Sequence, residues 1–126
     1  MTMLLAVASG GALGALGRHY LAGQAMRLLG HGFPWGTLLV NVLGCFAMGL
    51  LVELFARHFS PTQELRAFLT VGLLGAFTTF SAFSLEVGLL QGRGELGLAG
   101  LYVALSVGLS IGALFLGMGL VRGLPS

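Results

Sequence analysis

Long apolar runs, separated by short polar connectors, dominate the pattern of hydrophobic and polar positions along the chain. About 20 apolar residues suffice to cross a bilayer as a helix, and four runs reach that length. They cover, to within several residues, positions 3–26, 35–56, 65–90 and 95–121. None alternates with period two, which argues against a transmembrane barrel. The pattern predicts an all-α integral membrane protein, one domain over residues 1–126, with four transmembrane helices and both termini on one side.

The third run is unusual because its centre is polar. Between Gly72 and Ser84 it holds two adjacent threonines, two serines and two glycines. Ser and Thr hydroxyls compete for backbone hydrogen bonds, and Gly weakens a helix by roughly 1 kcal/mol relative to Ala. A helix broken at mid-membrane would use such residues, because freed carbonyls and amides can hold an ion. Close helix packing is the alternative, and composition alone leaves both open.

Composition excludes several classes of function. The 126 residues are 56% hydrophobic and 8% charged, with neither lysine nor aspartate, whereas roughly 25% of a typical soluble domain is charged. A net charge of +2 is too small to indicate nucleic-acid binding. The single cysteine, Cys45, excludes a disulfide framework and is predicted to be a small packing residue. The sequence contains neither a nucleophile–base pair nor a phosphate-binding loop, so it gives no indication of an enzyme.

The arginines give almost no preferred orientation in the membrane. Three are predicted on the side of the termini, and two or three on the other side. They are Arg57, Arg66 and Arg122, against Arg27, Arg93 and, near that end of its helix, Arg18. The positive-inside rule therefore fixes no orientation, and a chain that inserts both ways round could form an antiparallel dimer. Alternatively, the weak bias still orients the chain through its first helix.

Polar side chains on the first two helices are candidates for an ion path. Arg18 shares a face with Gly10 and Gly14, which permit close helix approach. Its charge could attract anions into a vestibule or anchor the helix at the interface. Thr37 and Asn41 share a face of the second helix. The Asn41 amide offers two N–H donors, which suits an anion, although an interhelical hydrogen bond would also use them.

Aromatic and hydroxyl side chains extend this set into the third and fourth helices. Phe80 and Phe83 share a face if the helix resumes after Thr79. Their ring edges could stabilise a partly dehydrated small anion, with plain packing as the alternative. The hydroxyls that could line the same path in the third helix belong to Thr79, Ser81 and Ser84.

The fourth helix carries two rows of residues spaced by four. The first is a polar stripe that could continue the path, unless its serines only bond their own backbone. The second consists of small residues and is predicted to be a packing face. The polar stripe is Tyr102, Ser106 and Ser110; the small row is Ala104, Gly108 and Gly112.

The residues from Gly72 to Phe83 follow the pattern Gly-x-x-Gly-x-x-Thr-Thr-Phe-Ser-x-Phe. This pattern resembles the third-helix signature of the fluoride channel family (Fluc, also called CrcB). Gly-x-x-x-Arg-x-x-Leu from Gly14 and Thr-Leu-x-Val-Asn-x-x-Gly from Thr37 are similar to the family's first- and second-helix motifs. The resemblance covers essentially the whole chain. Ala76 and Ala82 depart from it, where glycine and threonine are common.

The resemblance implies a passive channel that exports fluoride across the inner (plasma) membrane, built as an antiparallel homodimer with two pores. Phe80 and Phe83 map onto the family's pore phenylalanines, and Asn41 onto a pore-lining position. Gly75 and Thr78 map onto positions whose backbone carbonyls hold a central structural sodium ion between the subunits. The expected partners are fluoride, a second copy of the chain and the lipid bilayer, with no nucleic acid.

Two other classes of function share some of these features. Small multidrug exporters have four helices and dual insertion, but they resemble each other in a membrane-embedded glutamate in the first helix. The first run here contains no acid. A non-transporting assembly subunit, held together by its glycines, would tolerate changes at Asn41 and Phe80 without loss of ion flux. Glu86, about one turn beyond Phe83, is left without a role.

Overall fold

The computed structural model describes residues 1–124, and within that range it contains helices and short connectors but no β-strand. The prediction of an all-helical chain is therefore confirmed. In chain order the elements are α1 (Thr2–Leu29), α2 (Trp35–Arg57), α3 (Gln63–Arg66), η1 (Ala67–Leu74), α4 (Gly75–Phe77), α5 (Phe80–Gly92) and α6 (Leu96–Arg122). Because α3, η1 and α4 follow one another without interruption, they form a single half-helix that α5 continues after a break.

Three segments are long and apolar enough to cross a membrane. They are Trp35–Arg57, Gln63–Gly92 and Leu96–Arg122. Helix α1 has 28 residues and is about 42 Å long at 1.5 Å per residue. Its mean hydropathy, however, is lower than that of the three segments that qualify. Arg18, His19 and its glycines account for that difference. The membrane character of the chain thus rests on α2, α6 and the interrupted third segment, and α1 stays a predicted span.

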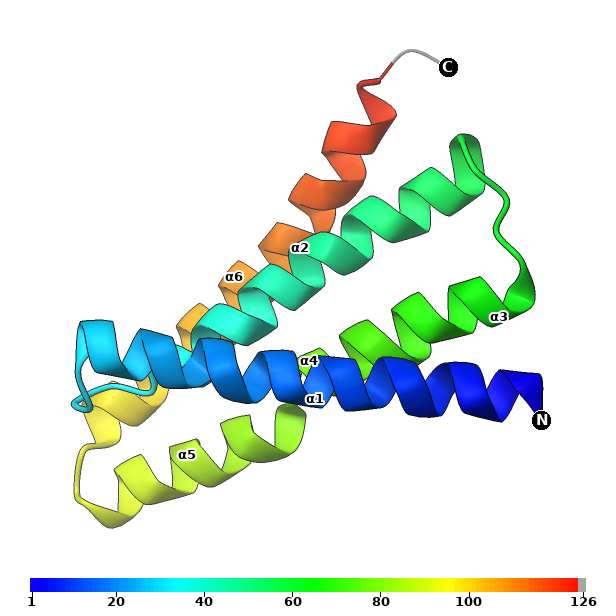
Figure 1. Ribbon diagram of the computed structural model, residues 1–126. Helices are drawn as coiled ribbons and strands as arrows, with labels where there is room; N and C mark the ends of the chain where they lie inside the picture. The colour runs from blue at the N-terminus through cyan, green and yellow to red at the C-terminus, as the bar shows by residue number, and fades with distance from the viewer. Residues whose placement is uncertain (125–126) are drawn as a thin grey trace.

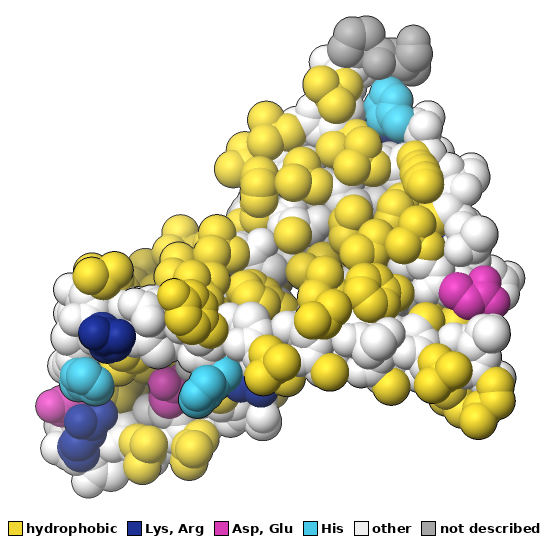
Figure 2. All heavy atoms as spheres, viewed as in Figure 1, with side chains coloured by type: hydrophobic (Ala, Val, Ile, Leu, Met, Phe, Trp, Pro, Cys, Tyr) yellow, Lys and Arg dark blue, Asp and Glu magenta, His cyan; other side chains and the backbone are white. Residues whose placement is uncertain are grey.

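The helices form two pairs that diverge from a common end. Helix α2 packs most extensively on α6, and α1 packs most extensively on η1. In Figure 1 the α2–α6 pair leaves α1 near the connectors at residues 30–34 and 93–95 and rises away from it. The N-terminus, the end of α6 and the connector at residues 58–62 lie at the opposite end. Hydrophobic side chains cover the middle of the molecule in Figure 2. Arg, His and Glu side chains gather toward the end that holds the connectors at residues 30–34 and 93–95.

Glycines bring the backbones of both pairs into contact. A Cβ at Gly14 would meet the backbone of Leu73 in η1, and one at Gly49 would meet the backbone of Leu114 in α6. The expected close approach of the first helix is confirmed, since Gly10 likewise lies against the backbone of Phe68. Small residues permit this packing because lipid supplies no hydrophobic drive for helices to associate.

The small row on α6 was expected to be a packing face; α6 does not pack through it within the described part of one chain, and a packing role toward a second chain stays a prediction. Ala104, Gly108 and Gly112 are exposed, and no atom lies within 4 Å of a Cβ built on either glycine. The physical reason is that α6 meets α2 through Gly117 instead, where a Cβ would contact the backbone of Phe46.

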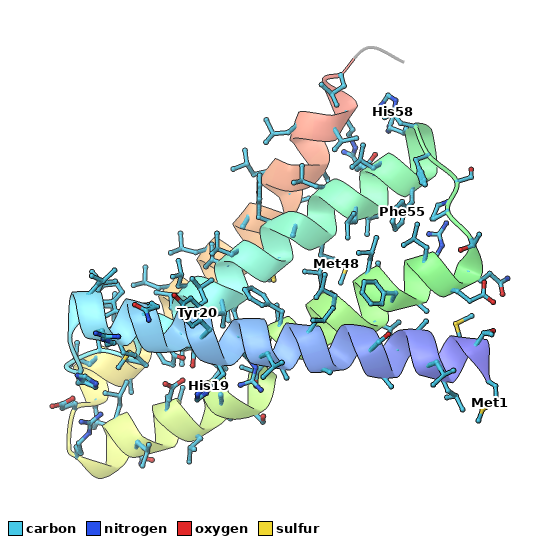
Figure 3. The ribbon with its side chains drawn as sticks, in the orientation of Figure 1. Met1, His19, Tyr20, Met48, Phe55 and His58 are labelled. Atoms are coloured by element: carbon cyan, nitrogen blue, oxygen red, sulfur yellow. The ribbon has the colours of Figure 1, made fainter. Side chains whose placement is uncertain are left out.

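Charged and aromatic side chains fix the end that carries the termini. The buried Glu53 accepts hydrogen bonds from Arg57 Nε at 2.7 Å and from Arg122 Nε at 3.0 Å, which joins α2 to α6. The guanidinium carbon of Arg66 lies 5.1 Å from the centre of the Phe55 ring. Figure 3 shows Phe55 directed from α2 toward α3. Two of the arginines counted for topology are thus paired within the chain.

We expect Gly14→Ala to destabilise the protein by about 1–3 kcal/mol, because its methyl group meets the Leu73 backbone, which cannot move aside. Gly11→Ala is the matched control on the same helix, since nothing lies within 4 Å of a Cβ there. Thermal unfolding in detergent, followed by loss of the monodisperse species, measures both. Equal midpoints for the two variants would contradict the close approach of α1 and η1.

Candidate functional site

The third membrane segment is interrupted at two consecutive threonines. Thr78 has φ −91° and ψ 156°, and Thr79 has φ −151° and ψ 124°, so both are extended. Each threonine closes one helix end with its side chain: Thr78 Oγ1 donates to Leu74 O at 3.0 Å, and Thr79 Oγ1 accepts from Ala82 N at 3.2 Å. The second contact is the usual N-cap of a helix. The adjacent threonines therefore explain why the break falls here.

Asn41 of α2 holds the break with both ends of its amide group. Its Nδ2 donates to Thr79 O at 3.1 Å, and its Oδ1 accepts from Thr79 N at 2.8 Å. These are two main-chain groups that would otherwise lack partners in lipid. The structure therefore gives Asn41 the interhelical bond that the sequence offered as the alternative, while one N–H of its amide is left for another acceptor.

Arg18 of α1 holds the other side of the break. Its Nε donates to Ala76 O at 3.1 Å, and Ala76 lies at the end of the half-helix, whose last carbonyls have no intrahelical partner. Sequence reasoning assigned Arg18 to a vestibule or an interfacial anchor and missed this contact. No sequence signal identifies it, because the two residues are 58 positions apart.

The main-chain oxygens of Gly75 and Thr78 differ from those of Ala76 and Thr79, which accept hydrogen bonds from Arg18 and Asn41. In the part of the chain that the structure describes, no hydrogen bond reaches the carbonyl of Gly75 or of Thr78. A hard cation prefers carbonyl oxygens of this type. The donor chemistry at the break therefore fits the cation that was expected there.

A cavity of about 350 Å³ opens beside the break, between α2, α5 and α6. It brings together six of the residues predicted for the ion path, from three helices and the break. They are Asn41, Thr79, Phe80, Phe83, Ser106 and Ser110. The hydroxyl oxygens of Ser106 and Ser110 are buried and have no hydrogen-bond partner among the residues that the structure describes. The cavity thus combines a mostly apolar wall with two hydroxyls that are not engaged elsewhere.

The two phenylalanines differ in their surroundings. The ring centres of Phe80 and Phe83 lie 5.4 Å apart with planes at 51°. Phe83 is buried at 8% exposure, whereas Phe80 is 76% exposed. The shared face expected from their spacing is therefore present, but only one of the rings is enclosed by its own chain.

A second cavity of about 220 Å³ lies between α1, α2 and α5 and contains Arg18, Thr37 and Glu86. His19 also lines it, on the side of α1 that faces α5 in Figure 3. The charged and polar lining distinguishes this cavity from the apolar one at the break.

Tyr102 contacts one lining residue of each cavity. Its side chain is fully buried, its ring centre lies 5.2 Å from that of Phe83, and its hydroxyl donates to Glu86 Oε1 at 3.0 Å. Glu86, which had no assigned role, therefore has a defined partner. Phe83, which the Tyr102 ring contacts, lines the first cavity, and Glu86, which the Tyr102 hydroxyl contacts, lines the second.

Not every predicted residue joins these cavities. Ser81 and Ser84 are exposed on α5 and line neither of the two; Ser81 Oγ lies 3.2 Å from Thr79 Oγ1. Conversely, Cys45 lines the first cavity although the sequence predicted a packing role for it. Cys45 lies four residues after Asn41 on the same helical face, and this spacing could have predicted that it lines the cavity.

Apolar helices of membrane length, an interrupted third span and a cavity of amide, hydroxyl and phenyl groups define a small multi-pass membrane protein with a polar site at mid-span. Residues 5–118 match the model of the family described as CrcB-like protein, Camphor Resistance (CrcB). The chain belongs to this family.

Relatives cover nearly the full length of the chain. Proteins from Rhodospirillum centenum and Rhizobium etli are 56% and 51% identical to it, over 97% and 98% of this chain and 97% and 99% of their own lengths. A protein from Chelativorans sp. is 56% identical over 97% of this chain and 98% of its own. All three are named fluoride-specific ion channel FluC.

We expect Asn41→Leu to accelerate hydrogen exchange at the Thr79 amide, because this amide loses its acceptor. An unsatisfied main-chain group costs about 1–3 kcal/mol. Exchange measured by mass spectrometry on fragments covering residues 75–85 reads the effect. Val52→Ala is the control on the same helix, since Val52 is exposed and lines neither cavity. Equal exchange in both variants would contradict the contact between Asn41 and the break.

Proposed function

We propose that this protein is a passive, fluoride-selective ion channel that exports fluoride across the inner (plasma) membrane. One observation carries the proposal: the cavity at the helix break joins Asn41, the Phe80–Phe83 pair and two unengaged serine hydroxyls. Relatives that cover the same length are named as fluoride-specific channels. The first helix carries no acidic residue, which disfavours an exporter that depends on one.

The lining suits an anion that must lose part of its hydration and then leave again. The serine hydroxyls and the remaining Asn41 N–H are neutral donors, and they replace water without a fixed positive charge inside the cavity. The phenyl rings offer weakly positive edges. Conduction needs binding that is strong enough for entry and weak enough for exit, and such a combination of donors meets this need.

Entry from one side is assigned to the second cavity. Arg18 and His19 line it, and the permanent charge of Arg18 favours anions there. The ion then passes Thr37 and Tyr102 to reach Phe83 and the serines. Ser81 and Ser84 are proposed to face the path only once a second chain lies against α5, because both are exposed in the single chain.

The channel is proposed to be an antiparallel homodimer with two pores. Phe80, Val107 and Ile111 line the cavity at the break and are also exposed, so one chain leaves this lining open. The exposed row of Ala104, Gly108 and Gly112 offers the kind of surface on which membrane helices pack. The near-equal distribution of arginines supports insertion in both orientations.

A structural sodium ion is proposed at the carbonyls of Gly75 and Thr78. Among residues 1–124 no hydrogen bond reaches these oxygens, and each would be costly if it remained unsatisfied in lipid. If bound, a cation would supply positive charge to the carbonyl end of the first half-helix, and the Gly75 and Thr78 carbonyls of both subunits would hold it. The residues of this chain that hold the break itself are Asn41 and Arg18.

We expect purified protein in liposomes to release fluoride, measured with a fluoride electrode, far faster than chloride under the same gradient. Phe80→Ile and Phe83→Ile should lower the fluoride rate by about ten-fold or more, since they remove ring edges from the path. Leu85→Ile is the control, because Leu85 is exposed and outside both cavities. Fluoride release that is absent, or no faster than chloride release, would refute the proposal.

Replacement of sodium by a large organic cation is expected to weaken the dimer, because the Gly75 and Thr78 carbonyls lose their counter-charge. Size-exclusion chromatography at low protein concentration, with and without sodium, measures the dimer fraction, and fluoride efflux measures function. Identical elution and efflux in both buffers would exclude a structural role for sodium.

A further inference from the structure

The cavity at the break contains a thiol. Cys45 lies four residues after Asn41 on α2, and both residues line the cavity together with Ser106 and Ser110 of α6. Cys45 is the one cysteine of the chain. Any effect of a thiol reagent on this protein must therefore act through this position.

The wall opposite Cys45 has room and unused polar atoms. Ser106 is 6% exposed, and within residues 1–124 its hydroxyl oxygen, like that of Ser110, has no hydrogen-bond partner. A buried hydroxyl without a partner costs free energy unless a water or a ligand satisfies it. The volume of about 350 Å³ exceeds the roughly 30 Å³ that a water molecule occupies. Small polar molecules can thus reach the neighbourhood of the thiol.

We propose that Cys45 is a modification site for small, uncharged thiol-specific electrophiles, and that its modification blocks the ion path. The Cys45 sulfur attacks the sulfenyl sulfur of a methanethiosulfonate ester. A new S–S bond forms, the S–S bond of the reagent breaks, methanesulfinate leaves, and the thiol proton passes to water. The added methylthio group projects into the space between Asn41 and the serines, where an ion must pass.

An uncharged reagent is specified because of the surroundings. The cavity wall is mostly apolar, and an uncharged reagent reaches the thiol without needing the donors that the proposed anion path supplies to a charge. Access of the reagent to the thiol depends on the cavity lining alone. The loss of flux rests additionally on the proposed fluoride conduction.

The test uses full-length protein in liposomes treated with methyl methanethiosulfonate. Intact mass spectrometry is expected to show one methylthio adduct per chain, and fluoride efflux to fall by about ten-fold or more relative to the untreated sample, because conduction depends on the space in the pore. Dithiothreitol should remove the adduct and restore the rate.

Two variants separate the position of the thiol from its mere presence. Cys45→Ser should take up no adduct and keep its own untreated rate after exposure to the reagent. Cys45→Ser/Val52→Cys moves the thiol to an exposed position on the same helix outside the cavity; it should take up the adduct without loss of rate. A chain that takes up no adduct at Cys45, or takes it up with unchanged efflux, overturns the proposal. Untreated protein without fluoride efflux would instead refute the channel function, and the adduct mass would still decide whether the cavity admits the reagent.

Discussion

Main-chain groups at Thr78 and Thr79 need partners in an environment that offers none. Both residues are extended, so the helical ladder stops in the middle of an apolar segment, where each unsatisfied group costs several kcal/mol in lipid. Asn41 satisfies both groups of Thr79, and Arg18 satisfies the carbonyl of Ala76. These contacts fix α1 and α2 against the break, and they also fix the break between the two helices.

This requirement also explains the packing around the break. Arg18 reaches Ala76 because α1 lies directly on η1, and that approach depends on glycines at Gly10 and Gly14. A Cβ at Gly44 would collide with the side chain of Thr78, so α2 also needs a glycine to bring Asn41 close. The small residues of this chain are therefore placed where helices must approach the interrupted segment.

Sequence reasoning succeeded where local chemistry decides the outcome. Adjacent threonines cap two helix ends, and a spacing of three brings Phe80 and Phe83 onto one face, so both features follow from neighbours along the chain. An interhelical bond of Asn41 was one of the alternatives from the sequence, but neither its partner Thr79 nor the bond from Arg18 to Ala76 could be predicted, since both depend on how separate helices are oriented. The same limit applies to Ala104, Gly108 and Gly112: a row of small residues indicates a packing face without indicating its partner, and no other helix of this chain covers the row among the described residues.

The position of Tyr102 adds a constraint on any ion path through this chain. Its ring contacts Phe83 beside the apolar cavity, and its hydroxyl donates to Glu86 in the charged cavity. While that bond is present, the hydroxyl proton is directed at a carboxylate and is not offered to an anion. An anion that moves from Arg18 toward the serines must therefore draw the hydroxyl away from Glu86 or pass on the Phe83 side of the ring. Because Tyr102 is fully buried, a rotation about its C–O bond is the smaller of these two changes.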